Sequence, residues 1–160
     1  MTNAQIPSKK ECLAILKKNK TPSNVVEHCK TVCKVAEYVA DKLAKKGLKI
    51  NKKLVVASAL LHDIKRGSDN HIIEGTKLLK SIGFLDISEV VRKHGLYKIE
   101  NDSVRPKTIE EKIVFYADKR VKGNKVVSLK ERIKDLNERY KKDFTHEFEF
   151  AKKIEKELLQ

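Results

Sequence analysis

The sequence predicts an all-α fold, and three observations lead to this prediction. Gly supplies only 6 and Pro only 3 of the 160 residues, whereas β-sandwiches and β-barrels need many turns. Apolar residues recur at the three- and four-residue intervals that mark one buried face of a helix. Capping boxes, in which Ser or Thr precedes Glu by three positions, occur at Ser8, Thr108 and Ser128. We therefore expect residues 1–160 to form a single-domain helical bundle of seven to eight helices.

The first two helices follow from local start and stop signals. The capping box at Ser8 opens the first helix. Pro22 stands in the first turn of the second helix, and Gly47 follows its end. A buried stripe with helical spacing runs along this second helix and comprises Val25, Cys29, Val32, Val35, Ala36, Val39, Ala40 and Leu43.

The third helix is predicted to lie at the centre of the bundle. Asn51 caps it, and it contains the nearly all-apolar segment Leu54–Leu61. The two helices that follow have an Asn or Asp at the start and a Gly at the end, namely Asn70 and Gly83 for the fourth, and Asp86 and Gly95 for the fifth.

The C-terminal part begins after the longest irregular stretch, Leu96–Lys107. Capping boxes at Thr108 and Ser128 open two further helices, and an amphipathic pattern predicts a last helix over Thr145–Leu159. The helices over 128–159 carry no motif that indicates catalysis.

The chain is strongly basic, with 36 Lys and Arg against 22 Asp and Glu and a formal net charge of +14. Such an excess attracts polyanions, which include nucleic acid, nucleotides and anionic lipid. However, the lysines are spread along the whole chain without a dense basic arm. A solvated surface explains most of them, so the charge alone does not identify a partner.

Two further patterns concern compartment and redox state. Cys29 and Cys33 are four residues apart, one helical turn, which predicts two small core side chains. The segment Leu54–Leu61 is far shorter than the ~20 apolar residues of a membrane span, and no secretory leader opens the chain. We therefore expect a protein of the reducing cytoplasm, without membrane association.

The positions of the histidines and aspartates indicate the chemistry of the protein. His28 lies on the stripe of the second helix, and His62-Asp63 directly follow the most apolar helix. Three further residues of these types lie beside apolar positions of separate helices, namely His71, His94 and Asp118. A lone His on an apolar face is usually a core residue, but buried carboxylates are unfavourable unless they are paired or bind a metal. Imidazole and carboxylate ligands converging from five helices therefore predict a metal site.

The order His28, His62-Asp63, Asp118 resembles the H…HD…D signature of the HD superfamily of metal-dependent phosphohydrolases, over about residues 24–121. The segment Leu60–Ile64, which reads LLHDI, is similar to the helix that carries the HD pair. His71–Gly75 resembles the H-x-x-x-G segment of the subset with two metals, and His94 resembles that subset's further histidine.

The resemblance implies an all-α bundle of the HD-domain type with one or two divalent metal ions. It implies that His28, His62, Asp63 and Asp118 surround the first ion. Asp63 would bridge to a second ion held also by two further ligands, His71 and His94. Fe and Mn are the preferred ions, with Ni, Co, Zn and Mg as alternatives.

The chain departs from the resemblance directly after the HD pair. The family's HDIGK continuation reads HDIKR here, so Lys65 replaces Gly and Arg66 takes the place of Lys. We predict catalytic roles for Asp63, Lys65 and Arg66. Because they neighbour ligands in sequence, the residues predicted to bind substrate phosphate are Arg66, Lys93 and Lys119. The loop Leu96–Lys107 is expected to select the substrate, and His146, outside the pattern, is expected to be exposed.

Two functions from different classes remain. The resemblance implies hydrolysis of a phosphoester or phosphoanhydride bond in a small phosphorylated substrate, best a nucleotide or dinucleotide, by a metal-activated water. The alternative is a non-catalytic HD-like module whose basic surface binds RNA or a signalling nucleotide. Turnover of a phosphoester would favour the first, and RNA binding with a steep salt dependence but no turnover would favour the second. The sequence leaves the oligomeric state open.

Overall fold

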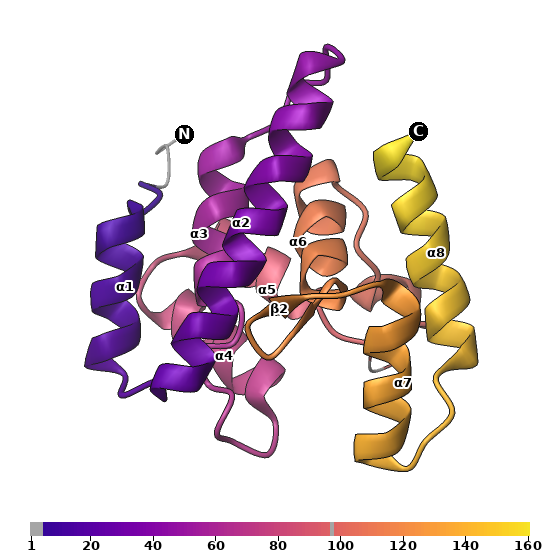
Figure 1. Ribbon diagram of the computed structural model, residues 1–160. Helices are drawn as coiled ribbons and strands as arrows, with labels where there is room; N and C mark the ends of the chain where they lie inside the picture. The colour runs from indigo at the N-terminus through magenta and orange to yellow at the C-terminus, as the bar shows by residue number, and fades with distance from the viewer. Residues whose placement is uncertain (1–4, 97) are drawn as a thin grey trace.

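The protein is described here by a computed structural model, which describes residues 5–96 and 98–160. Within these residues it contains eight α-helices and one short β-hairpin, so the all-α prediction is confirmed (Figure 1). In chain order the helices are α1 (Lys9–Lys18), α2 (Ser23–Lys45), α3 (Lys52–Leu61), α4 (His71–Ser81), α5 (Leu85–Arg92), α6 (Ile109–Lys119), α7 (Leu129–Tyr140) and α8 (Thr145–Leu159).

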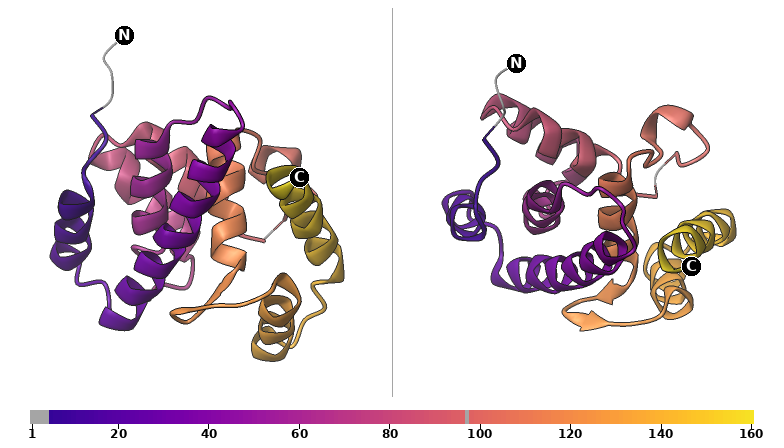
Figure 2. Two further views of the ribbon diagram at one scale, coloured as in Figure 1. Left: turned by 45° about the horizontal axis from the view of Figure 1, so that its top comes forward. Right: turned by 90° about the horizontal axis from the view of Figure 1, so that it is seen from above.

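Helix α3 occupies the centre of the bundle. It packs against α1, α2, α5 and α6, and the view from above shows it surrounded by its neighbours (Figure 2, right). Val55, Ala57, Ala59 and Leu61 are each 0% exposed, which is why this helix has an almost continuous apolar sequence rather than a single apolar stripe. Its end therefore delivers the residues that follow into the interior.

Four of the predicted caps form as expected, including Asn51, which accepts from the Leu54 amide, whereas the Asn70 side chain makes no capping hydrogen bond. The Thr108 side chain accepts a hydrogen bond from the Glu111 amide, and the Glu111 carboxylate accepts one from the Thr108 amide, which completes a capping box. Ser8 and Ser128 likewise accept from the amides three residues on, those of Glu11 and Glu131.

The prediction for the fifth helix was wrong at both ends. Helix α5 begins at Leu85, with Phe84 in the capping position, so Asp86 lies in the first turn. There its charge still favours the helix, because the N-terminal end of a helix dipole attracts anions. The helix ends at Arg92, three residues before the Gly95 that was expected to close it.

A hairpin that the sequence analysis did not predict follows α6. Strands β1 (Val121–Lys122) and β2 (Lys125–Val126) pair antiparallel with Val121 opposite Val126. Gly123 has a φ of +61° in the connecting turn, a left-handed conformation that glycine adopts without strain. The Gly-Asn pair between two β-prone dipeptides is a hairpin signal that was overlooked.

Helices α7 and α8 lie beside α6, at the end of the molecule opposite α1 (Figures 1 and 2). The predicted irregular stretch before α6 contains one short 3₁₀ helix, Asp102–Val104. Cys29 and Cys33 are buried in the core with Cys12, and all three are free thiols, so their predicted core role is confirmed.

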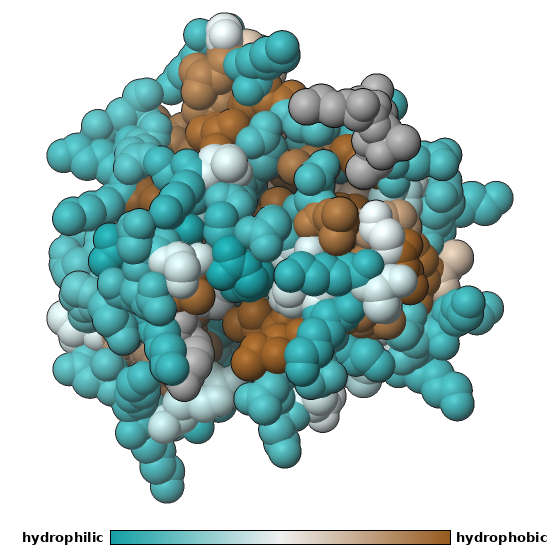
Figure 3. Space-filling model, turned by 180° about the vertical axis from the view of Figure 1, so that it is seen from behind, coloured by the Kyte–Doolittle hydropathy of each residue, from teal (hydrophilic) through white to brown (hydrophobic). Residues whose placement is uncertain are grey.

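One face of the molecule is mainly hydrophilic (Figure 3). The face seen from behind carries mainly hydrophilic residues, with hydrophobic ones in separate small patches (Figure 3). Within the described residues, no helix is both long enough and apolar enough to cross a membrane.

Candidate metal centre

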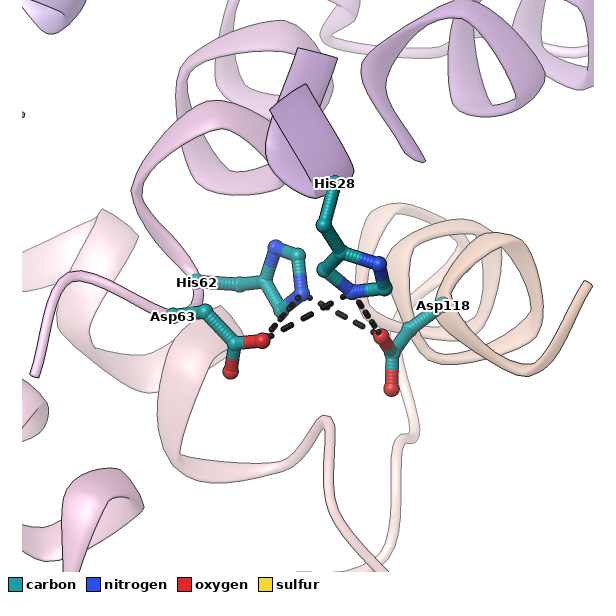
Figure 4. Close-up of side chains that lie close together, drawn as sticks. All are labelled: His28, His62, Asp63 and Asp118. Atoms are coloured by element: carbon teal, nitrogen blue, oxygen red, sulfur yellow. Dashed lines mark hydrogen bonds and ion pairs between the residues drawn. The ribbon is translucent and has the colours of Figure 1, made fainter. Parts of the chain in front are cut away.

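Two histidines and two aspartates from three parts of the chain meet in the interior (Figure 4). His28 comes from α2, His62 and Asp63 directly follow α3, and Asp118 comes from α6. Nε2 of His28 lies 3.1 Å from Asp118 Oδ1 and 3.6 Å from Asp63 Oδ2. Nε2 of His62 lies 3.2 Å and 3.5 Å from the same two oxygens. These side chains are called the four-residue group below.

The HD pair reaches this position because α3 ends in the core. The helix stops at Leu61, and the chain turns there, with the Ile64 amide donating to the Leu61 carbonyl. His62 is 0% and Asp63 5% exposed. A tight turn at the end of a buried helix therefore places both side chains where α2 and α6 converge.

The second carboxylate oxygen of Asp63 faces two other histidines. Its Oδ1 lies 3.7 Å from Nε2 of His71 and 3.5 Å from Nε2 of His94. Asp63, His71 and His94 make up the three-residue group, whose candidate ligand atoms lie within 4.8 Å of one another, as do those of the four-residue group. The two groups share only Asp63, which presents one oxygen to each.

Backbone carbonyls orient three of the four imidazoles. The Nδ1 atom of each donates to a carbonyl oxygen, and the partners are Gly123 for His28 at 2.7 Å, Ala59 for His62 at 2.6 Å and Val91 for His94 at 2.6 Å. Because a carbonyl can only accept, Nδ1 carries a proton, and Nε2 is the nitrogen that faces the carboxylates and can ligate a metal ion once its own proton is lost. This is the arrangement in which imidazoles ligate metals.

The charges of the centre are strongly coupled. Burial favours neutral Asp63, but His62 and His94 outweigh it and hold its pKa well below the ordinary value. Burial likewise opposes ionisation of Asp118, but Lys119, His28 and His62 lower its pKa well below normal. Both carboxylates are thus anionic, as metal ligands must be.

The residues present fit a divalent ion. Oδ1 of Asp63 is buried and accepts no hydrogen bond from any residue that the structure describes. A buried carboxylate oxygen without a partner is unfavourable, and a cation beside it would remove that penalty. The donor set, imidazole nitrogens with carboxylate oxygens, is the one that first-row divalent ions accept.

Arg66 lies beside the three-residue group. Its Nη1 donates to Nε2 of His71 over 3.1 Å, and its Nη2 donates to the Tyr140 hydroxyl over 3.3 Å. Burial and the nearby guanidinium lower the pKa of His71 to about 4, although Asp63 opposes the shift. His71 is therefore neutral and accepts the bond from Arg66.

The three predicted lysines occupy different environments. Nζ of Lys119 is buried and donates to the His94 carbonyl at 2.8 Å and to Asp118 Oδ2 at 2.7 Å. Nζ of Lys93 donates to Glu111 over 2.9 Å. Lys65 is half-buried in the turn after α3. A direct contact of any of them with substrate stays a prediction.

A cavity of about 500 Å³ opens onto the four-residue group. It is lined by His28 and Asp63, by Arg66, and by residues of α2, the hairpin turn and α7, namely Ser23, Asn24, Val25, Glu27, Gly123, Asn124, Arg132 and Arg139. The contributions of the hairpin and α7 to this cavity were not predicted from the sequence. The overlooked Gly-Asn signal could have indicated the first, but no local signal indicates the second.

The loop expected to select the substrate lies elsewhere. Lys98 and Val104 line a separate cavity of about 320 Å³ together with Ile72 and Arg92, and no described residue of 96–107 lines the larger cavity. The loop is held against α5, where Nη1 of Arg92 donates to the Ser103 carbonyl. His146, in contrast, is exposed as expected.

Comparison with known proteins supports the motif-based resemblance. A family model described as "HD domain" matches residues 25–121, close to the range of about 24–121 expected from the motifs. The match includes both histidine-aspartate groups and ends at Val121, the first residue of β1, so it excludes α7 and α8.

Three curated relatives are similar to most of the chain. A tRNA (cytidine(56)-2'-O)-methyltransferase of Picrophilus torridus is 33% identical over 96% of this chain, but the match covers 47% of that protein. A methyltransferase of the same name from Thermoplasma volcanium is 34% identical over 79% of this chain and 40% of its own length. An uncharacterized protein of Methanocaldococcus jannaschii is 33% identical over 83% of this chain and 86% of its own length.

The chain thus spans less than half the length of the two methyltransferases that it matches. No solved structure matches the chain.

Proposed function

The chain belongs to the HD-domain family, and on this premise we propose that it is a metal-dependent phosphohydrolase that cleaves a phosphoester or phosphoanhydride bond of a nucleotide or dinucleotide. One observation carries the proposal. The two oxygens of Asp63 face two separate sets of imidazole nitrogens, at 3.5–3.6 Å on the Oδ2 side and 3.5–3.7 Å on the Oδ1 side. A bridging carboxylate of this kind suits a two-metal hydrolytic site.

The ligand roles in this proposal follow the two groups. His28, His62, Asp63 and Asp118 hold one divalent ion, and Asp63, His71 and His94 hold a second, with Fe or Mn preferred and Ni, Co, Zn or Mg as alternatives. When bound, such ions polarise a phosphoryl oxygen and make a water molecule acidic enough to supply hydroxide near neutral pH.

The chain's own residues orient and bind the substrate. Arg66 lies at the cavity with two of its guanidinium nitrogens directed at side-chain acceptors, His71 and Tyr140. Both acceptors are neutral groups, and a phosphate oxygen is a stronger, charged acceptor for the same planar donor. In the proposal Arg66 exchanges these partners for a substrate phosphate. Burial of the centre excludes bulk water and strengthens that contact.

A second candidate function has its own support. Two relatives are named as tRNA-modifying enzymes, and the chain carries a net charge of +14. An HD-like module that holds RNA through this basic surface would need no hydrolysis. However, surface charge does not require two buried carboxylates among four histidines, so we rank hydrolysis first.

The test is a hydrolysis screen on protein whose metal content has been measured. Purified protein, stripped with chelator and reloaded with Mn²⁺, Fe²⁺, Ni²⁺, Co²⁺, Zn²⁺ or Mg²⁺, is assayed against nucleotides, dinucleotides and phosphodiesters. Asp63→Asn is the inactive variant, and His146→Ala, which removes an exposed histidine outside both groups, is the matched control. Turnover that is lost in Asp63→Asn and kept in His146→Ala supports the proposal. Salt-sensitive RNA binding without turnover would support the second function.

A further inference from the structure

Three guanidinium groups line the cavity, and two of them come from outside the family match. Arg66 follows the HD pair, whereas Arg132 and Arg139 belong to α7, which lies beyond residues 25–121. Arg132 and Arg139 are seven residues apart, about two helical turns, so they point to the same side of α7. Helix α7 thus contributes cations to a cavity whose other side is formed by His28 and Asp63.

Arg132 is the more unusual of the pair because it is buried. It is 7% exposed, whereas arginine in an ordinary helix keeps its guanidinium in water. Its Nη1 donates to Asp135 Oδ2 at 3.2 Å. Its Nε is buried and has no hydrogen-bond partner among the residues that the structure describes. A buried donor without an acceptor is unfavourable, and a ligand in the cavity that Arg132 lines could supply one.

The neighbouring acid does not neutralise the arginines. Asp135 is shared between Arg132 at 3.2 Å, Arg139 at 3.0 Å and Lys122 at 3.8 Å. One carboxylate therefore faces three cations. The carboxylates that line the cavity itself are those of Glu27, which accepts from Lys30, and Asp63 in the metal centre. The α7 side of the cavity consequently keeps positive charge that an anion can neutralise.

We propose that Arg132 and Arg139 form a second phosphate subsite, and that the substrate is a phosphoanhydride chain, such as a nucleoside polyphosphate, rather than a monophosphate. This inference rests on the proposed phosphohydrolase function. One phosphate lies against the two histidine-aspartate groups, and a later phosphate of the same chain is bound by α7. Arg132 and Arg139 are specificity-determining residues in this arrangement.

The cavity has room for such a ligand. Its volume of about 500 Å³ lies within the ~300–1,000 Å³ of ordinary small-molecule sites and exceeds the needs of a single phosphate. Because Asp63 and both α7 arginines line the same space, an extended anion can contact the metal centre and α7 at once.

The experiment measures binding separately from catalysis. Inorganic tripolyphosphate is titrated by calorimetry into chelator-treated protein comprising residues 1–160, so hydrolysis does not contribute. We expect Arg139→Gln and Arg132→Gln each to weaken binding by about 10-fold, as the loss of one charge-assisted contact does. Lys134→Gln, which removes an exposed charge from the same helix, is the matched control and should change the affinity less than 2-fold.

The choice of variants separates a loss of tripolyphosphate binding from a loss of folding stability. The Arg139 side chain is 46% exposed, so Arg139→Gln tests the subsite even where Arg132→Gln lowers the thermal midpoint. Wild-type affinity in both arginine variants, or no binding of tripolyphosphate by the parent protein, would overturn the subsite. A short RNA that displaces tripolyphosphate more effectively than ATP does would assign the arginines to a nucleic-acid backbone and also overturn it.

A different result would show that the proposed phosphohydrolase function, rather than the subsite, is wrong. Retained tripolyphosphate binding through α7, together with no turnover of any phosphoester by the metal-loaded protein, would contradict the hydrolase and leave the anion subsite standing. In an active enzyme, the same arginine variants should raise KM about 10-fold for a nucleoside triphosphate and leave KM for a monophosphate unchanged.

Discussion

Arg66 donates a hydrogen bond from Nη1 to Nε2 of His71 over 3.1 Å. A neutral imidazole has one acceptor nitrogen, so the lone pair that accepts from Arg66 is the one that would face a metal ion beside Asp63 Oδ1. The guanidinium and an ion in the three-residue group therefore compete for His71. Movement of Arg66 toward a substrate phosphate would release that lone pair and couple substrate binding to the second metal position.

We expect Arg66→Ala to strengthen binding of the second ion by about 10-fold, because it removes both a competitor for His71 and a positive charge near the ion. At the same time kcat/KM should fall by roughly 10- to 100-fold, the effect of losing one charge-assisted phosphate contact of about 1.5–3 kcal/mol. Calorimetric titration with Mn²⁺ and steady-state kinetics measure the two effects. Arg66→Lys, which keeps the charge without the planar donor, should recover only part of kcat/KM. Unchanged metal affinity in Arg66→Ala would contradict the competition.

Loss of a ligand from the three-residue group should change the number of metal ions bound per chain. His94→Ala should reduce the bound metal from about two ions per chain to about one, because Nε2 of His94 faces only the Oδ1 side of Asp63. Elemental analysis of protein equilibrated with excess Mn²⁺ measures the ratio. His146→Ala, an exposed histidine outside both groups, should keep the parent ratio. A ratio equal to the parent's in His94→Ala would indicate a mononuclear site.

The hairpin that follows α6 should affect the metal centre through one carbonyl. Gly123 accepts the Nδ1–H of His28, and its φ of +61° makes a β-branched replacement strained by ~1–2 kcal/mol. Gly123→Val should therefore displace this carbonyl and weaken metal binding by roughly 10-fold, as the loss of a ligand's supporting hydrogen bond does.

Gly47→Val is the matched control for Gly123→Val. Gly47 also has a positive φ, of +92°, in a turn with open space around it, so the variant should lose comparable stability by thermal unfolding. It lies at the far end of α2 from His28 and should keep the parent metal affinity. Equal metal affinities in the two variants would mean that the hairpin does not orient His28.

Features that depend on local chemistry could be predicted from the sequence. The apolar run of α3 predicted its central place, and that place explains why His62-Asp63 become buried where the helix ends. The six histidines and aspartates could be grouped because each neighbours apolar positions of its own helix. Helix starts with Ser or Thr caps were found for the same reason.

Features that depend on distant contacts were not predictable in this way. Asp135, Arg132 and Arg139 form a pattern typical of any solvated helix face, and only the packing of α7 beside α6 turns two of them toward the cavity. The burial of Lys119 likewise depends on the His94 carbonyl, 25 residues earlier. Long side chains adjacent to a ligand in sequence can point either way along the helix surface.

Glu111 makes stability depend on pH. Its Oε1 accepts from the amides of Lys107 and Thr108, and its Oε2 accepts from Lys93. Burial favours the neutral acid, but these donors outweigh it and lower the pKa below the ordinary 4.5. Because the folded-state pKa is the lower one, the stabilisation is complete above pH 4.5 and is lost as pH falls through the folded value.

Glu111→Gln should therefore lower the free energy of unfolding by about 1–3 kcal/mol at pH 7, and by progressively less below pH 4.5. Urea denaturation at a series of pH values measures the difference. Glu131→Gln is the control, since Glu131 holds the equivalent position after Ser128 in α7 but is exposed. A Glu111→Gln difference that stays constant down to pH 3 would show that the carboxylate charge is not what stabilises this helix start.

The last prediction concerns Lys119, for which two roles give opposite results. Its side chain is 3% exposed, and its ammonium joins the His94 carbonyl to Asp118 Oδ2, the oxygen of Asp118 opposite the one that faces the imidazoles. Lys119→Met keeps the length and apolar stem of the side chain but leaves both acceptors without this donor. If Lys119 acts by orienting Asp118, metal affinity should fall by roughly 10- to 100-fold, and kcat at saturating metal should recover. If it contacts substrate phosphate instead, metal affinity should equal the parent's while KM rises. Titration with Mn²⁺, followed by kinetics at saturating Mn²⁺, separates the two roles. We expect the first result, because an ammonium held by two buried acceptors would have to break both bonds to reach a ligand in the cavity.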